Sequence, residues 1–280
     1  MRKRLCGAVR ECDSREMRCI AEFFWGVNAV QFAARTHVGL VRKSNQDGYL
    51  IRMREERECI ALVADGMGGQ RAGEVASALA IDIMWDHLSR PGEFTDPASQ
   101  LKWTIMRANE AIYEKSREVI EYAGMGTTVV ATYATPETVH YAHVGDSRIY
   151  MFSKPYGLRR LTEDHSLVHE LVRRGQVTAE EAFSHPQRHL LTRALGTLPA
   201  VEAECASTQW HEGDLLLMCS DGLTTCMMDR EIEACFQTDI PLHEQVNHLV
   251  EMSLSRGAPD NITVIALFHD GEPVWRDSRS

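Results

Sequence analysis

The sequence predicts an α+β fold whose strands form antiparallel sheets. Stretches of β-rich alternation and stretches of helical periodicity come in blocks, without the strict strand–helix alternation that builds parallel sheets. The 280 residues contain no internal repeat, no low-complexity tract and no linker, which favours a single domain. With 44% hydrophobic and 25% charged residues, the composition is typical of a soluble globular protein.

Strands are expected where β-branched and aromatic residues alternate with polar ones or form short apolar runs. Such stretches lie near 32–38, 48–53, 59–64, 127–134, 138–144, 147–152, 214–219 and 262–268. The segment YATPETV at 133–139 is typical of a hairpin turn and joins two of these strands.

Three helices are expected from apolar residues that recur at helical spacing. The first lies in AGEVASALAIDIMWDHL and ends before the PG pair at 91–92; its stripe is Val75, Leu79 and Ile83. The second carries the stripe Leu101, Ile105, Ala108 and Ile112. The third covers about 241–256 and turns inward Leu242, Val246, Leu249, Val250 and Leu254.

A polar insertion with helical character covers about 162–196. Thr178 and Glu181 have the spacing of a capping box that opens a short helix. Asp164 or Ser166 could cap the helix before it. The insertion is therefore expected to consist of short helices joined by turns.

The charge and the cysteines exclude several classes of function. The net charge is −10, and no long basic run follows Met1–Arg4, which argues against a nucleic-acid-binding face. None of the eight cysteines forms a CxxC pair, so a zinc ribbon is unsupported and a reducing compartment is expected. Cys59 and Cys219 lie in or beside apolar runs and are expected to be buried.

Residues 1–30 are expected to be an N-terminal extension. The opening MRKR is followed by charged residues where a signal peptide would need an apolar stretch. No segment approaches the ~20 apolar residues that span a bilayer, and we expect a cytoplasmic protein. The segment 20–30 is either a partner-binding or membrane-surface patch, or part of an extension that is partly disordered or packed on the domain.

Four aspartates at expected strand ends or turns predict a metal site. They are Asp47, Asp65, Asp221 and Asp260. Strands of one sheet bring their ends to one edge, where two carboxylates about 4 Å apart repel by about 4 kcal/mol at an effective dielectric constant of about 20. Divalent cations that prefer oxygen ligands, such as Mg²⁺ or Mn²⁺, would neutralise this cluster.

Each of these residues also has a purely structural interpretation. The DG pairs at 65–66 and 221–222 are turn signals, but both follow an apolar run that ends a strand. Asp146 in HVGDSRIY could simply end one strand and begin a turn. Arg42 precedes Asp47 by five residues, so its guanidinium could bind a phosphate in the same pocket or could remain exposed.

Several ordered blocks of the sequence resemble the metal-dependent protein phosphatases, the PPM or type 2C serine/threonine phosphatases, in their compact bacterial form. The blocks are THVGLVRKSNQD, VADGMGGQRAGEVAS, GMGTTVVAT, HVGDSRIY, LTEDHSLVHEL, HPQRHLLTRALG, GDLLLMCSDGL and GAPDNITV. They run from about Ala33 to Phe268. The resemblance implies two antiparallel β-sheets packed as a central sandwich, flanked by helical layers, with a metal centre at one end.

The resemblance also implies a role for each site residue. Asp65 would bridge two metal ions, Mn²⁺ or Mg²⁺, and the Gly66 carbonyl would hold one of them. Asp47 would bind on the side of the second ion, and Asp221 and Asp260 on the side of the first. Asp146 would bind a third ion together with Asp221, and Arg42 would hold the substrate phosphate. Residues 162–196 would form a flap beside the site.

The implied reaction is hydrolysis of phosphoserine or phosphothreonine by direct attack of a hydroxide that bridges the metals. The partners would be phosphorylated proteins and a cytoplasmic kinase that the enzyme opposes, and the protein is expected to be a monomer. Residues 31–270 would form one catalytic domain, followed by a tail at 271–280. A phosphoprotein-binding module with weak catalysis and a phosphoesterase for small molecules are the alternatives.

The sequence departs from the family pattern at three positions near the site. Gln46 stands where many relatives have a glutamate, and Gln70 and Met67 stand where different relatives have a histidine. The proton donor for the leaving serine or threonine is therefore unassigned. A metal-bound water or His165 are the candidates.

Overall fold

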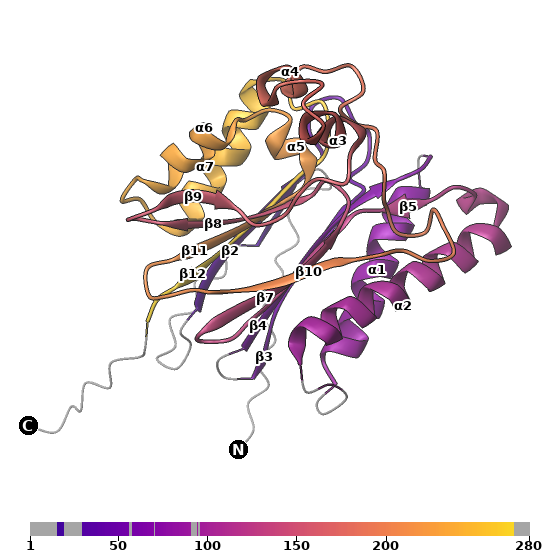
Figure 1. The fold of residues 1–280 in the computed structure, drawn as a ribbon, viewed down its shortest axis with the longest axis horizontal. Helices are drawn as coiled ribbons and strands as arrows, with labels where there is room; N and C mark the ends of the chain where they lie inside the picture. The colour runs from indigo at the N-terminus through magenta and orange to yellow at the C-terminus, as the bar shows by residue number, and fades with distance from the viewer. Residues whose placement is uncertain are drawn as a thin grey trace, which may run out of the picture.

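The computed structural model describes residues 16–19, 30–55, 58–69, 71–90, 94 and 96–271. Two six-stranded sheets face each other, and helices cover their outer faces (Figure 1). All the strand pairings described are antiparallel. The expected α+β sandwich is confirmed.

The first sheet has the order β1-β2-β12-β11-β8-β9. Its strands are β1 (Glu16–Cys19), β2 (Val30–His37), β12 (Ile262–His269), β11 (Leu215–Cys219), β8 (Arg148–Ser153) and β9 (Gly157–Arg160). The second sheet has the order β10-β7-β6-β4-β3, with β5 paired to β4. Its strands are β10 (Glu204–Gln209), β7 (Thr138–Val144), β6 (Val129–Ala134), β4 (Glu58–Met67), β3 (Asp47–Glu55) and β5 (Gly126–Thr127).

Helices α1 (Ala72–Leu88) and α2 (Pro97–Glu118) pack on the second sheet, and the 3-10 helix η1 (Ile120–Tyr122) follows them. Helices α6 (Asp229–Phe236) and α7 (Leu242–Ser255) pack on the first sheet. Three short helices lie near the end of the sandwich (Figure 1). They are α3 (Leu167–Arg173), α4 (Ala179–Phe183) and α5 (Asp221–Thr224).

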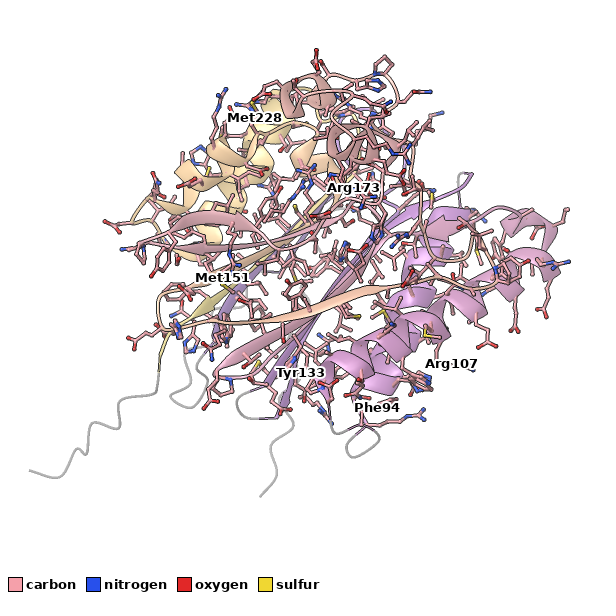
Figure 2. The ribbon with its side chains drawn as sticks, in the orientation of Figure 1. Phe94, Arg107, Tyr133, Met151, Arg173 and Met228 are labelled. Carbon is pink, nitrogen blue, oxygen red and sulfur yellow. The ribbon has the colours of Figure 1, made fainter. Side chains whose placement is uncertain are left out.

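Apolar side chains form three layers because the central strands are buried on both faces. In β11, Leu215 and Leu217 face the helices, whereas Leu216 and Met218 face the other sheet. The same alternation places Met151 of β8 between the sheets (Figure 2). Side chains that alternate between two apolar faces give a continuous apolar run in the sequence, as in LLLMC of β11.

The expected helices are present, with one difference in the buried stripe. The stripe of α2 is fully buried as predicted. In α1, the fully buried residues are Ala76, Ala80, Met84 and Leu88. Val75, Leu79 and Ile83, which were expected to face inward, are only partly buried at the side of the same layer. The alanines of α1 pack against the sheet, and their small side chains let the helix approach it closely.

Several elements differ from the expectations. The predicted strand 127–134 is interrupted at Thr128. The strands β9 and β10 and the helix α6 were not predicted from the sequence. Ser166, not Asp164, caps α3 by accepting a hydrogen bond from the backbone of His169. The capping box of Thr178 and Glu181 is present at α4.

The N-terminal extension contributes a strand to the first sheet. β1 pairs with β2, so this part of the extension is packed on the domain. Residues 1–15, 20–29 and 272–280 lie outside the described residues. Cys59 and Cys219 are buried as expected. Among the residues that the structure describes, no helix has the length and apolar character needed to cross a membrane.

Candidate active site

The predicted aspartates lie together at one end of the sandwich. Asp47 begins β3 and Asp65 lies near the end of β4, where the two residues are paired in the strand register. Asp146 lies in the turn between β7 and β8, and Asp260 lies just before β12. Asp221, expected at a strand end or turn, lies two residues after the end of β11 and is the first residue of α5. Five segments far apart in the sequence therefore supply the cluster.

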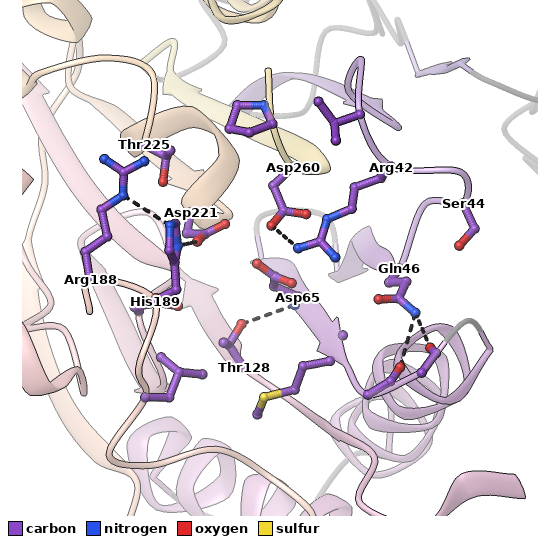
Figure 3. Close-up of a pocket in the computed structure, with 18 of the residues that line it drawn as sticks. Arg42, Ser44, Gln46, Asp65, Thr128, Arg188, His189, Asp221, Thr225 and Asp260 are labelled. Atoms are coloured by element: carbon purple, nitrogen blue, oxygen red, sulfur yellow. Dashed lines mark hydrogen bonds and ion pairs between the residues drawn. The ribbon is translucent and has the colours of Figure 1, made fainter. Parts of the chain in front are cut away.

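A cavity of about 740 Å³ is formed where these segments meet. Asp65, Asp146, Asp221 and Asp260 line it, and Arg42 lies on its wall beside Asp260 (Figure 3). The lining does not include Asp47, whose carboxylate accepts hydrogen bonds of 2.7 Å from the hydroxyl groups of Ser220 and Thr263. These two bonds both reach Oδ2 and fix the orientation of the Asp47 side chain.

Burial and mutual repulsion raise the pKa values of these carboxyl groups. The pKa of Asp47 is raised to about 7, chiefly by burial and further by repulsion from Asp221 and Asp260, although hydrogen bonds from two hydroxyl groups oppose the shift. The pKa of Asp65 lies well above its ordinary value because of burial and then repulsion from Asp47 and Asp221. Burial and the charge of Asp221 also raise the pKa of Asp146. The repulsion expected from the sequence is therefore a property of the folded site.

The donor set fits hard divalent cations. All the converging side chains offer oxygen, the ligand that Mg²⁺ and Mn²⁺ prefer. Asp47 Oδ1 and Asp221 Oδ1 are buried and have no hydrogen-bond partner in the described part of the chain. Buried polar atoms are almost always paired, so these two oxygens are suited to a metal ion.

Arg42 points at the carboxylate cluster from the cavity wall. Its guanidinium Nη2 donates to Asp260 Oδ2 at 2.7 Å, and the side chain remains 53% exposed. The hydrogen bond to Asp260 raises the pKa of Arg42, so the group stays charged. An arginine held in this way can present its remaining N–H donors to an anion in the cavity.

The family model for protein phosphatase 2C matches residues 39–261, a span that contains all five aspartates and Arg42. The chain belongs to the protein phosphatase 2C family. The resemblance recognised in the sequence is therefore confirmed over the region that builds the site.

Known proteins with similar sequences or structures are bacterial phosphatases. The serine/threonine phosphatase stp of Listeria monocytogenes is 37% identical over 247 residues, which are 87% of this chain and 98% of that protein. Serine/threonine phosphatase Stp1 from Staphylococcus aureus has a TM-score of 0.81 and 32% identity, covering 94% of this chain and 100% of that one. The catalytic domain of the phosphatase PstP, solved with 2 manganese ions, has a TM-score of 0.75 and 34% identity, covering 85% and 97% of the chains.

The loop after Asp65 brings the backbone of this phosphatase close to the cavity. Gly66 has no room for a side chain, because a Cβ there would lie 2.1 Å from the carbonyl oxygen of Gly73. The backbone N–H of Gly66 donates to the carbonyl of Gln46 at 3.1 Å. This contact fixes the peptide between Asp65 and Gly66, which directly precedes the carbonyl that was predicted to hold a metal ion.

The side chain of Gln46 contacts the glycine-rich loop that follows Gly66. Its side-chain amide donates to the carbonyl of Gly69 at 2.8 Å and lies 3.4 Å from that of Gly68 (Figure 3). A carboxylate could not make these contacts, because carbonyl oxygens accept but do not donate. Met67 lines the cavity, and Gln70 lies outside the described residues.

Thr128, which interrupts the predicted strand, connects two parts of the phosphatase site. Its hydroxyl accepts a hydrogen bond from the backbone of Asp65 at 3.1 Å and bonds to the Ser147 hydroxyl at 2.7 Å. Ser147 follows Asp146 directly. Thr128, between β5 and β6, therefore connects Asp65 at the end of β4 to the turn that carries Asp146.

The flap supplies three cavity residues that the sequence did not single out, Arg188, His189 and Leu191. Arg188 and His189 line the cavity on the side opposite Arg42 (Figure 3). His189 Nδ1 lies 3.7 Å from Asp221 Oδ2, and Arg188 Nε donates to His189 Nε2 at 3.1 Å. The signal was the basic pair in HPQRH, within an insertion already expected beside the site.

His165, considered as a proton donor from the sequence, does not line the cavity. Its Nδ1 accepts a hydrogen bond from the backbone of Gly145 at 3.1 Å, and its Nε2 pairs with Glu204 at 3.0 Å. His143, His165 and Glu204 bring potential metal-ligand atoms within 4.8 Å of one another. Both ring nitrogens of His165 are therefore hydrogen-bonded. The contact with Glu204 on β10 connects the base of the flap to the second sheet.

Proposed function

We propose that this protein is a Mn²⁺- or Mg²⁺-dependent phosphatase that hydrolyses phosphoserine and phosphothreonine in proteins. The observation that carries the proposal is the convergence of aspartates from separate segments of the chain, two of which carry buried oxygens that lack a hydrogen-bond partner among the described residues. Asp47, Asp65, Asp221, Asp260 and the Gly66 carbonyl would hold two core ions. The two manganese ions bound to the similar PstP domain support this assignment. Asp146 would hold a third ion together with Asp221.

Bound cations would supply a hydroxide near neutral pH and offset the negative charge of the phosphate. Arg42 would bind phosphate oxygens through its planar fork and stabilise the charge that develops on them. Water attacks phosphorus in line, the bond to the serine or threonine oxygen breaks, and that oxygen leaves with a proton. The reaction needs no nucleophilic side chain, so no phosphoenzyme is expected.

We further infer that residues 31–270 act as one catalytic unit, with 1–30 as an extension and 271–280 as a tail. A monomeric cytoplasmic enzyme that opposes a serine/threonine kinase is the arrangement we propose. The serine/threonine phosphatases among its relatives support the part of this inference that concerns serine/threonine phosphorylation.

Hydrolysis of p-nitrophenyl phosphate and of a phosphothreonine peptide tests the proposal. We expect turnover with Mn²⁺, none with EDTA, and a loss of about 10³-fold or more in Asp221→Asn, because this carboxylate would serve two metal positions. The control variant is Asp239→Asn, which removes an acidic group that is 95% exposed. A folded protein that binds the phosphopeptide but does not hydrolyse it, or that hydrolyses it in EDTA, would contradict the proposal.

A further inference from the structure

The mouth of the cavity carries exposed apolar side chains. Leu40 and Val41 are 63% and 69% exposed and directly precede Arg42. Val41 and Pro259 line the cavity together with Arg42. We call Leu40, Val41 and Pro259 the apolar rim. Exposed apolar residues that gather next to a binding pocket often mark a contact with a ligand or partner.

The apolar rim is held in place by backbone contacts. The backbone N–H of Leu40 donates to the carbonyl of Ala258 at 3.0 Å. Gly39 has a φ of +79°, and a Cβ at this position would lie 2.2 Å from the carbonyl oxygen of Asp260. The two loops that form the apolar rim are therefore packed against each other. Leu40 and Val41 are exposed because the fold presents them, not because the segment is frayed.

The flap also carries an exposed apolar side chain next to residues of the cavity wall. Leu190 is 50% exposed and lies between His189 and Leu191, which both line the cavity. Its carbonyl accepts a hydrogen bond of 2.8 Å from the backbone of Leu167, which anchors it to the start of α3. Apolar side chains thus belong both to the loop beside Arg42 and to the flap.

We propose that the apolar rim is a subsite for an apolar side chain next to the phosphorylated residue of the substrate. The inference rests on the proposed function, because Arg42 must hold the phosphate for the neighbouring residue to reach Val41. Consecutive Cα atoms lie ~3.8 Å apart, so the neighbour of the phosphorylated residue remains close to the mouth. The floor of the cavity is formed by carboxylates and is unsuited to an apolar group, whereas the apolar rim can bury one.

An acidic neighbour is the competing substrate chemistry. Lys43 and Arg188 also line the cavity and would attract a carboxylate. We favour the apolar neighbour because Leu40 and Val41 lose unfavourable contact with water when they are covered, whereas exposed ion pairs contribute little. The two chemistries give opposite orders of preference in a single experiment.

The test uses phosphothreonine peptides that differ only at the residues on either side of the phosphothreonine. Leucine, serine and glutamate are placed there in turn, and kcat/KM is measured with the full chain and Mn²⁺. We expect the leucine peptide to exceed the serine peptide by about fivefold. In Leu40→Ser/Val41→Ser this ratio should fall close to one. Tyr156→Ser, which changes an 88% exposed residue between β8 and β9, should keep the wild-type ratio.

The outcomes separate the subsite from the catalytic proposal. A wild-type enzyme that hydrolyses p-nitrophenyl phosphate but prefers serine or glutamate peptides, or has no preference, overturns the subsite alone. A double variant that loses activity equally on all three peptides keeps the wild-type ratio and overturns it as well. Absence of metal-dependent hydrolysis on every substrate overturns the proposed function instead. Melting temperatures of the variants show whether they remain folded.

Discussion

At the residue scale, His189 is a candidate for the proton donor that the sequence left unassigned. It lies on the cavity wall, whereas His165 is held between Gly145 and Glu204 away from it. Because Arg188 donates to Nε2 of His189, the neutral ring carries its proton on Nδ1, the nitrogen that lies nearer to Asp221. His189 is therefore able to present an N–H donor to a group bound in the cavity.

We expect His189→Gln to slow hydrolysis of a phosphothreonine peptide by about tenfold. The kcat for p-nitrophenyl phosphate should change by less than about twofold. Its leaving group, p-nitrophenolate, is stable without a proton, whereas the threonine alkoxide must be protonated as it leaves. Steady-state kcat on the two substrates measures the difference. The control is His211→Gln, which alters a histidine outside this cavity lining. An equal fall on both substrates would contradict a role in protonating the leaving group.

Gln46 sets the shape of the loop that presents the Gly66 carbonyl. Residues that orient the ligands of a metal site change its affinity by about 10–100-fold when they are replaced. Gln46→Met keeps the size of the side chain but removes the hydrogen bonds to Gly68 and Gly69. We expect Mn²⁺ to bind about tenfold more weakly to this variant in titration calorimetry.

Gln31→Met is the matched control for this prediction. Gln31 lies on strand β2, and the substitution removes an exposed hydrogen bond from its side-chain amide to Asp270. Its Mn²⁺ affinity should equal that of the wild type. Unchanged affinity in Gln46→Met would show that the Gly66 carbonyl does not depend on the glutamine amide.

At the element scale, a partly buried ion pair connects the base of the flap to β8. Arg148 donates two hydrogen bonds to Asp164, of 2.9 and 2.7 Å. Although burial opposes it, Arg148 holds the pKa of Asp164 below its ordinary value. Asp164 opens the flap, and Arg148 follows Asp146 by two residues, so the pair connects the flap to a cavity loop.

We expect Arg148→Met to lower the free energy of unfolding by about 2 kcal/mol, because it removes two charge-assisted hydrogen bonds and leaves the Asp164 carboxylate, which is only 11% exposed, with the longer 3.6 Å contact to Arg160. The double variant Arg148→Met/Asp164→Leu should recover much of this loss. The control Arg107→Met breaks an exposed pair with Glu110 and should cost less than about 1 kcal/mol. Urea unfolding measures all three variants. A single variant as stable as the Arg107 control would contradict the prediction.

The elements also show what could be predicted from the sequence. The apolar runs of β4 and β11 and the stripe of α2 were recognisable because their periodicity follows directly from burial. Strand β10 was not, because ECASTQ is polar and mostly exposed at a sheet edge. Its position depends on pairing with β7, a contact between distant segments that no local pattern records.

The candidate site was predictable in a similar, partial way. Asp47 and Asp65 stand at strand ends, so their convergence followed from the sheet. His189 depends on how the flap folds back over the cavity, which no periodicity encodes. The hydrogen bonds of Gln46 likewise depend on the path of the glycine-rich loop. The convergence of carboxylates at strand ends was therefore predictable, and the contacts of His189 and Gln46 were not.

At the scale of the whole molecule, the acidic cavity is stabilised by protons or by cations. A carboxyl group whose pKa is raised in the folded state binds more protons when folded than when unfolded. Its stabilising contribution is complete below the ordinary value of 3.8 and is lost as pH rises through the folded value, which for Asp47 is about 7. Asp65 and Asp146 shift in the same direction. The metal-free protein should therefore lose stability as the carboxyl groups ionise.

Thermal melts from pH 5 to pH 8, with EDTA and with Mg²⁺, test this linkage. We expect the melting temperature gained on adding Mg²⁺ to be greater at pH 8 than at pH 5, by about 5 °C. The pKa values of His143 and His165 are lowered by burial and act in the opposite direction. The relevant quantity is therefore the difference in melting temperature between the Mg²⁺ and the EDTA samples at each pH. Asp47→Asn should reduce its pH dependence, and a gain that is the same at every pH would contradict the prediction.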